Sequence, residues 1–105
     1  MPLQLAFIGD VRPHEALAIT DPGTGDPAFL FRLASGRVVC YDGLCTHEEC
    51  PVDFDASSEL FVCPCHGAVF DPAHSGRVLA GPTRRALPEI PLFIDPATGA
   101  ITIAP

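Results

Sequence analysis

Two short segments rich in cysteine and histidine constrain the fold of this 105-residue chain more than any other feature. The first is Cys45-Thr46-His47, and the second, Cys63-Pro64-Cys65-His66, begins after fifteen intervening residues. Each segment places a soft thiolate and a borderline imidazole close together, and both groups bind transition metals. A chain this short buries only a modest core, so a metal centre or a disulfide would help to stabilise it.

The composition predicts an all-β protein without long helices. The chain has 9 Gly and 12 Pro residues, and 48% of its residues are hydrophobic. The hydrophobic share excludes a disordered polar tail, whereas the many turn-forming residues argue against long helices. Short apolar runs separated by such turn residues are typical of β-strands.

The apolar runs place the expected strands along the chain. We expect strands at residues 3–8, 16–19, 28–33, 37–41, 77–79, 92–94 and 100–103. Residues 44–71 break this regular rhythm and contain most of the Cys and His residues. The sequence shows no internal repeat, linker or second domain, so residues 1–105 are expected to form a single domain.

The charge of the chain narrows its expected partners. The net charge is −7, and the six basic residues are all Arg. A strongly acidic chain does not attract nucleic acid, so no nucleic-acid partner is expected. The acidity suggests instead a partner protein with a basic docking patch and a salt-sensitive association.

The amino-terminal residues predict no targeting or membrane-spanning segment. Residues 1–8 are fairly apolar, but no basic region precedes them and Asp10 follows closely. This run is too short for a signal-peptide core with a cleavage site, and far too short to span a bilayer. We expect a cytoplasmic protein without membrane insertion. A periplasmic or extracytoplasmic location is the alternative if the chain has been trimmed from an exported protein.

Two metal chemistries fit two Cys and two His residues. A [2Fe–2S] cluster is satisfied when two thiolates bind one iron and two imidazoles bind the other. A single zinc ion also accepts two Cys and two His ligands. Zinc knuckles more often pair two cysteines in the first turn, which this chain does not do.

The spacing C-x-H-x15-C-x-x-H resembles the signature of the Rieske family. The neighbouring residues agree with this resemblance, because Gly67 follows the second segment and Phe70-Asp71 closes it. Gly81-Pro82-Thr83 resembles the start of the Pro loop that covers the cluster in that family, here about residues 81–88. The resemblance extends roughly over residues 28–103.

The resemblance implies the Rieske fold, which is a small antiparallel β-sandwich or open barrel. A cluster-binding subdomain of two loops, here about residues 44–71, belongs to that fold. It also implies a single [2Fe–2S] cluster in which Cys45 and Cys63 bind one iron, and His47 and His66 bind the other. Redox partner proteins would then dock near the His-ligated iron.

Cys50 and Cys65 are not ligands in the family pattern. Rieske subunits of quinol-oxidising complexes carry a disulfide at these two positions, so the resemblance implies a Cys50–Cys65 bond between the loops. Such a bond would rigidify the loops against opening and solvent entry. The alternative is a pair of reduced buried thiols.

The fifth cysteine, Cys40, lies in an apolar run and is expected to be a small core residue.

Two departures from the quinol-oxidising pattern indicate a lower reduction potential. Ala68 and Phe70 stand where high-potential Rieske subunits carry a Ser and a Tyr that donate hydrogen bonds to cluster sulfurs. Glu48 and Glu49 stand where those subunits carry an apolar tip that docks at a quinone site. The alternative for the two glutamates is that they are ordinary solvated surface charges.

These features together predict a soluble Rieske ferredoxin that passes one electron at a time to an oxygenase or another redox enzyme. The alternatives are the Rieske domain of a quinol-oxidising or periplasmic complex, and a regulatory or structural subunit without redox activity. We expect an electron carrier rather than an enzyme, because a fully ligated cluster leaves no open metal position for a substrate.

Overall fold

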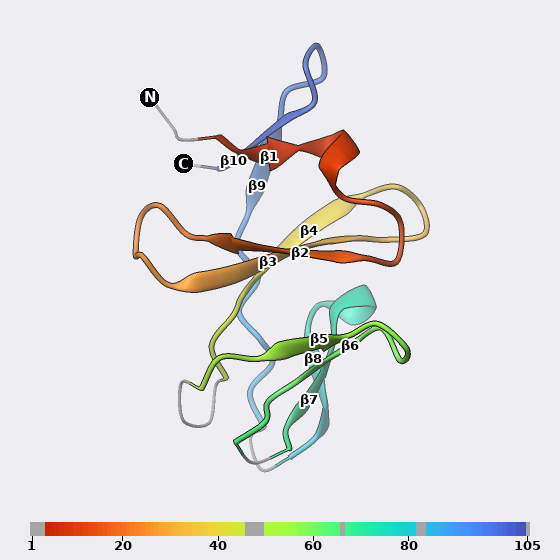
Figure 1. The fold of residues 1–105 in the computed structure, drawn as a ribbon, viewed down its shortest axis with the longest axis vertical. Helices are drawn as coiled ribbons and strands as arrows, with labels where there is room; N and C mark the ends of the chain where they lie inside the picture. Colours follow the sequence, from red (N-terminus) through yellow and green to blue (C-terminus); the bar gives the residue numbers. More distant parts are fainter. Residues whose placement is uncertain (1–3, 46–49, 66, 82–83, 105) are drawn as a thin grey trace.

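The computed structural model describes residues 4–45, 50–65, 67–81 and 84–104. Within these ranges the chain forms ten strands and two short 3₁₀ turns, with no α-helix (Figure 1). The strands are β1 (Gln4–Phe7), β2 (Ala16–Thr20), β3 (Pro27–Arg32), β4 (Val38–Asp42), β5 (Asp53–Asp55), β6 (Leu60–Val62), β7 (Val69–Asp71), β8 (Arg77–Ala80), β9 (Leu92–Ile94) and β10 (Ala100–Ile103). The 3₁₀ turns are η1 (Ile8–Asp10) and η2 (Pro72–His74).

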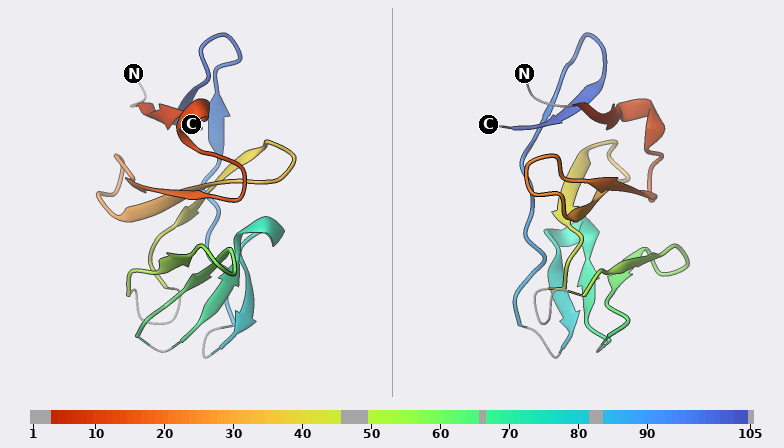
Figure 2. Two further views of the ribbon diagram at one scale, coloured as in Figure 1. Left: turned by 45° about the vertical axis from the view of Figure 1, so that its right-hand side comes forward. Right: turned by 60° about the vertical axis from the view of Figure 1, so that its left-hand side comes forward.

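Three antiparallel sheets are stacked along the long axis of the molecule (Figure 1). The upper sheet has the strand order β1-β10-β9, the middle sheet β2-β3-β4, and the lower sheet β5-β6-β7-β8. After β8 the chain runs back along one side of the molecule, past the middle sheet, to β9 (Figure 2). The expectation of an all-β fold is confirmed.

Strands β3 and β4 of the middle sheet are buried on both faces because each carries a continuous apolar run, Ala28 to Phe31 on β3 and Val38 to Tyr41 on β4. On β3, Leu30 belongs to a core shared with the upper sheet, whereas Phe31 belongs to a core shared with the lower sheet. Cys40 and Tyr41 alternate in the same way on β4. Successive side chains of a strand point to opposite faces, so a continuous apolar run supplies two cores.

The lower core is built largely from aromatic rings. Phe61 lies at its centre, with ring centroids 4.9 Å from Phe29 and 5.5 Å from Phe54. Tyr41 packs edge-on against Phe61 and donates a hydrogen bond of 2.7 Å from its hydroxyl to the backbone oxygen of Pro72. This bond anchors η2, and with it the start of β8, to the middle sheet.

Residues 44–71 are more regular than the sequence pattern indicates. This region contains β5, β6 and β7, which pair with one another and with β8 to form the lower sheet. Each of these three strands has only three residues. A run of three residues is too short for an alternating pattern to be recognised, and pairing with neighbouring strands determines its conformation.

The segment after the lower sheet connects all three sheets. Leu87 donates its N–H to the oxygen of Gly76 at the start of β8. The backbone N–H of Asp42 donates to the backbone oxygen of Pro88, and the N–H of Ile90 donates to the oxygen of Cys40. Residues 88–90 therefore pair with the edge of β4. The return of the chain past β4 therefore fixes the lower sheet relative to the middle one.

Replacement of Gly76 by Ala is expected to destabilise this junction. Gly76 has a positive φ, and an added Cβ would lie 2.9 Å from the oxygen of Leu87 and 3.0 Å from the ring of Tyr41. Gly25 also has a positive φ but has nothing within 4 Å, so Gly25→Ala is the matched control for backbone strain alone. The steric clash should lower the unfolding free energy of Gly76→Ala by a further 1–3 kcal/mol, roughly the range for overpacking. Equal thermal unfolding midpoints for the two variants would contradict this assignment.

The buried Cys40 and Tyr41 are expected to make stability fall at alkaline pH. Burial raises the pKa of the Cys40 thiol to about 12 and that of the Tyr41 phenol to about 12. The unfolded chain releases these protons near the ordinary pKa values of 9.0 and 10.0, whereas the folded chain retains them. The contribution of the two groups to the unfolding free energy is thus fully present below pH 9.0 and is lost as the pH rises toward 12.

The contribution of the thiol is measured by comparing wild type with Cys40→Ala. The unfolding free energy of wild type should fall more steeply between pH 9 and 11, by up to about 1.4 kcal/mol per pH unit for one group. Urea denaturation across this range provides the slopes, and parallel slopes would show that Cys40 titrates normally.

Candidate metal centre

The first loop, which connects β4 to β5, folds back on itself and buries Cys45 at its base. Leu44 pairs with Pro51 in an isolated β-bridge, and Cys45 donates its N–H to the oxygen of Cys50 at 2.7 Å. Val52 closes the loop by donating to the oxygen of Gly43 at 2.8 Å. Cys45 is only 1% exposed and packs in the lower core.

The second loop, between β6 and β7, has the same construction. Cys63 donates its N–H to the oxygen of Ala68 at 2.8 Å, and its own oxygen accepts the N–H of Gly67 at 2.9 Å. Gly67 takes a positive φ of 76°, a conformation in which glycine has no steric penalty. Cys63 is 1% exposed and lies in the same core as Cys45.

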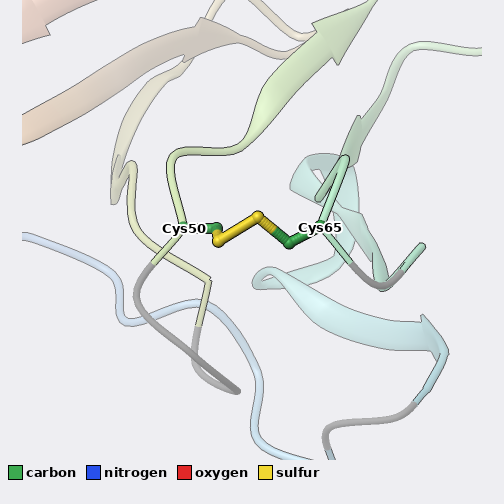
Figure 3. Close-up of a disulfide and its surroundings, with 2 residues drawn as sticks. All are labelled: Cys50 and Cys65. Atoms are coloured by element: carbon green, nitrogen blue, oxygen red, sulfur yellow. A yellow bond between two sulfur atoms is a disulfide. The ribbon is translucent and has the colours of Figure 1, made fainter.

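A disulfide between Cys50 and Cys65 ties the two loops together (Figure 3). The Cα atoms of the two residues are 6.4 Å apart, and they are separated by 15 positions in the sequence. Cys50 is half-buried and Cys65 is exposed, so the bond crosses the outer side of the loops while Cys45 and Cys63 lie beneath. The structure confirms the pairing that the resemblance implied, and the alternative of two reduced thiols is wrong for this structure.

The donor set of the loops fits a [2Fe–2S] cluster. Cys45 and Cys63 take no part in a disulfide, and they lie in one core at the bases of two cross-linked loops. His47 and His66 follow them by two and three positions, so each loop offers one thiolate and one imidazole. Both histidines lie outside the described residues, and the same holds for Glu48, Glu49 and Pro82.

The remaining histidines belong to other parts of the molecule. His14 contacts the carboxylate of Glu59 at 2.6 Å, and His74 contacts that of Asp71 at 2.7 Å. Their side chains are 57% and 65% exposed, which agrees with surface positions. Neither lies in the two loops.

The described surroundings of the loops provide no hydroxyl at the two positions that depart from the quinol-oxidising pattern. Ala68 and Phe70 are both fully buried in the lower core, and their side chains have no hydrogen-bond donor. Gly81 follows β8 directly and is exposed. The position of Cys40 is also as expected, because it is buried in the upper core, away from Cys45 and Cys63.

Two residues that support the site are not among those expected from the sequence. Tyr41 packs in the same core as both buried loop cysteines, and its hydroxyl bond to Pro72 holds the lower sheet in place. Leu87 closes this core from the returning segment and is 2% exposed. Tyr41 is the only Tyr of the chain, and a single phenol within an apolar run is a signal of a buried hydrogen bond.

Comparison with known proteins identifies the family. A sequence model of the Rieske [2Fe–2S] domain matches residues 4–91. The chain belongs to the Rieske family. The cofactor of this family is a [2Fe–2S] cluster held by two Cys and two His ligands, and its domains transfer electrons.

Similar proteins come from more than one functional class. An iron–sulfur subunit of the cytochrome b6-f complex of Nicotiana tabacum is 34% identical over 96 residues, which is 82% of this chain and 41% of the subunit. The solved plasma membrane Rieske protein of Synechocystis has a TM-score of 0.80 and 28% identity, and the match covers 98% of this chain and 99% of that one. A ferredoxin of Sphingomonas yanoikuyae has a TM-score of 0.72 and 25% identity, with 98% and 97% covered.

This Rieske domain is short beside its curated relatives. It spans between 15% and 41% of the length of those that it matches. No described segment is a helix long and apolar enough to cross a membrane.

Removal of the Cys50–Cys65 bond is expected to lower the stability of this domain. The bond closes a loop of about 15 residues, for which chain entropy corresponds to about 3 kcal/mol. We expect a Cys50→Ala/Cys65→Ala variant to unfold at a clearly lower temperature and to lose its iron faster in the presence of a chelator. Cys40→Ala removes a cysteine outside the loops and serves as control. An unchanged midpoint and iron-loss rate in the double variant would contradict a stabilising role of the bond.

Proposed function

We propose that this Rieske domain is a one-electron carrier in which Cys45 and Cys63 bind one iron of a [2Fe–2S] cluster, and His47 and His66 bind the other. The observation that carries this proposal is the burial of Cys45 and Cys63 at the bases of two loops joined by a disulfide. Iron thiolates require deprotonated cysteines shielded from oxidants and water, and this position provides that shielding.

The bound cluster supplies a site that stores and releases a single electron. The protein contributes a fixed geometry, because the loop hydrogen bonds and the disulfide restrain the backbone on both sides of the site. The aromatic core beneath Cys45 and Cys63 excludes water from their side of the site. The domain is a carrier rather than an enzyme, because a cluster with four protein ligands offers no open position for a substrate.

Within this function we favour a soluble ferredoxin that delivers electrons to an oxygenase or another redox enzyme. The side chains of Ala68 and Phe70 carry no hydrogen-bond donors for the cluster sulfurs, so a reduced, more negative cluster is less stabilised. The two carboxylates of Glu48 and Glu49 disfavour docking of the first loop into an apolar quinone site. The likeness to the Sphingomonas ferredoxin over nearly the whole of both chains supports this proposal.

The second candidate is the Rieske domain of a quinol-oxidising or periplasmic redox complex. The specific observation that favours it is the disulfide, which the resemblance associates with that class. The similarity to the b6-f subunit supports it as well. A regulatory or structural subunit without redox activity is not favoured, because all four ligand residues are present in the sequence.

The partners proposed here are a redox donor and a redox acceptor that dock near the His-ligated iron. Asp53 and Asp55 are exposed on β5, directly after the first loop. Hydrogen bonds from Ser57 and Ser58 lower the pKa of the Asp55 carboxyl, so this residue keeps its negative charge. A partner with a basic patch would complement this edge, and a cytoplasmic setting is consistent with the ferredoxin role.

The reduction potential, measured by film voltammetry, tests the proposed function. Rieske clusters span about −150 to +300 mV. A one-electron couple between about −150 and +100 mV would support the ferredoxin role. A potential near the upper end of the range would favour the quinol-oxidising or periplasmic alternative, and the absence of any reversible couple would refute electron transfer altogether.

Restoring the two missing donors is expected to raise the potential. A hydrogen bond to a charged group contributes about 1.5–3 kcal/mol, and about 1.4 kcal/mol corresponds to 59 mV for one electron. We therefore expect Ala68→Ser/Phe70→Tyr to shift the potential upward by roughly 100 mV or more. Ala28→Ser makes the same buried change in the upper core and should leave the potential unchanged. Equal potentials in all three proteins would show that these positions do not control the cluster.

A further inference from the structure

Three sulfur atoms of the loops lie close together. The Sγ atoms of Cys50, Cys63 and Cys65 are all within 4.8 Å of one another. Cys50 and Cys65 form the disulfide, whereas Cys63 is not in a disulfide and has the role of an iron ligand in the proposed function. A thiol held this close to a disulfide is in position to exchange with it, because exchange proceeds by attack of a thiolate on a disulfide sulfur.

We propose that Cys63 exchanges with the Cys50–Cys65 disulfide whenever it is not bound to iron, so that the pairing of the cysteines records whether the cluster is present. This inference rests on the proposed function, in which iron holds the Cys63 sulfur and prevents its attack. The product has a Cys50–Cys63 disulfide and a released Cys65 thiol.

The positions of the three residues determine which sulfur is attacked. Attack on Cys65 would join two cysteines separated only by Pro64, whose ring restricts the backbone that such a short loop must bend. Attack on Cys50 joins two different loops and leaves Cys65 as the departing group. Cys65 is exposed, so water solvates the departing thiolate, whereas Cys63 is buried.

The step is balanced without an external oxidant or reductant. The Cys63 sulfur forms a bond to the Cys50 sulfur while the bond between Cys50 and Cys65 breaks. The electron pair of the broken bond leaves with the Cys65 sulfur, which takes a proton from water. The proton that the Cys63 thiol gave up to become a thiolate balances this one, so the overall change is an isomerisation.

In the cluster-free protein, the exchange would block rebinding of the cluster. The Cys50–Cys63 disulfide consumes one of the two thiolates that the cluster needs, so the cluster cannot rebind until the exchange is reversed. Reversal requires attack by Cys65 or by an added thiol. Since Cys65 is exposed, its new thiol is accessible to small thiol reagents, whereas the buried Cys63 is not.

The test is a disulfide map of the wild-type protein before and after removal of iron. Iron is removed anaerobically with a chelator, and the protein is then unfolded at mildly acidic pH in denaturant that contains N-ethylmaleimide, so that buried thiols are blocked as well. The peptides are sequenced by mass spectrometry. We expect Cys50–Cys65 as the disulfide of the iron-loaded protein, and Cys50–Cys63 with blocked Cys65 as the main form afterwards. Retention of Cys50–Cys65 with blocked Cys63 would overturn the proposal.

Two variants that each remove one thiolate ligand provide a matched comparison. Cys45→Ser leaves the group of three sulfurs intact, so it should show Cys50–Cys63 without any chelator. Cys63→Ser lacks the attacking sulfur and should keep Cys50–Cys65. If both variants keep Cys50–Cys65, the exchange does not occur. The map of the chelated wild type remains decisive if either variant fails to fold.

Failure of this inference is distinguishable from failure of the proposed function. Iron content and visible absorbance of the purified wild type report whether a cluster is bound. A wild type that binds iron and keeps its native disulfide after chelation refutes the exchange alone. A wild type that never binds iron refutes the proposed function, and its disulfide map then still shows whether Cys63 has exchanged.

Discussion

Burial of the middle sheet on both faces is the constraint on which the rest of the structure depends. Strands β3 and β4 send alternate side chains into an upper core with β1, β9 and β10 and into a lower core with the loop cysteines. Because Tyr41 and Cys40 are neighbours on β4, the two cores cannot shift independently of each other. The lower sheet is thereby held against the middle sheet, which lies directly above it in Figure 1.

The candidate metal centre combines this rigid base with a cross-link at its outer side. Backbone hydrogen bonds close each loop at its own base, and these bonds place Cys45 and Cys63 in the aromatic core. The Cys50–Cys65 disulfide then joins the loops where no core can do so, because Cys65 is exposed. The same proximity that makes the cross-link possible also places Cys63 beside it, so rigidity and susceptibility to exchange have one structural origin.

Membership of the Rieske family identifies the cofactor, but it does not distinguish between the functional classes within the family. The family establishes the class of cofactor and electron transfer, whereas the chain is similar both to a subunit of a cytochrome complex and to a ferredoxin. The choice between these classes depends on the residues near the cluster, and in this chain different residues favour different classes. The disulfide favours one class, while Ala68 and Phe70 favour the other.

The sequence by itself defined a candidate donor set, because two Cys and two His residues stand at fixed spacings. It also predicted the buried strands β3 and β4 from their long apolar runs. It did not reveal β5, β6 and β7, since strands of three residues form only when neighbouring strands supply their hydrogen bonds. Only the tertiary structure decided that Tyr41 and Leu87 lie beneath the loops and that Cys63 lies beside the disulfide. Such contacts join residues far apart in the chain, and no local pattern encodes them.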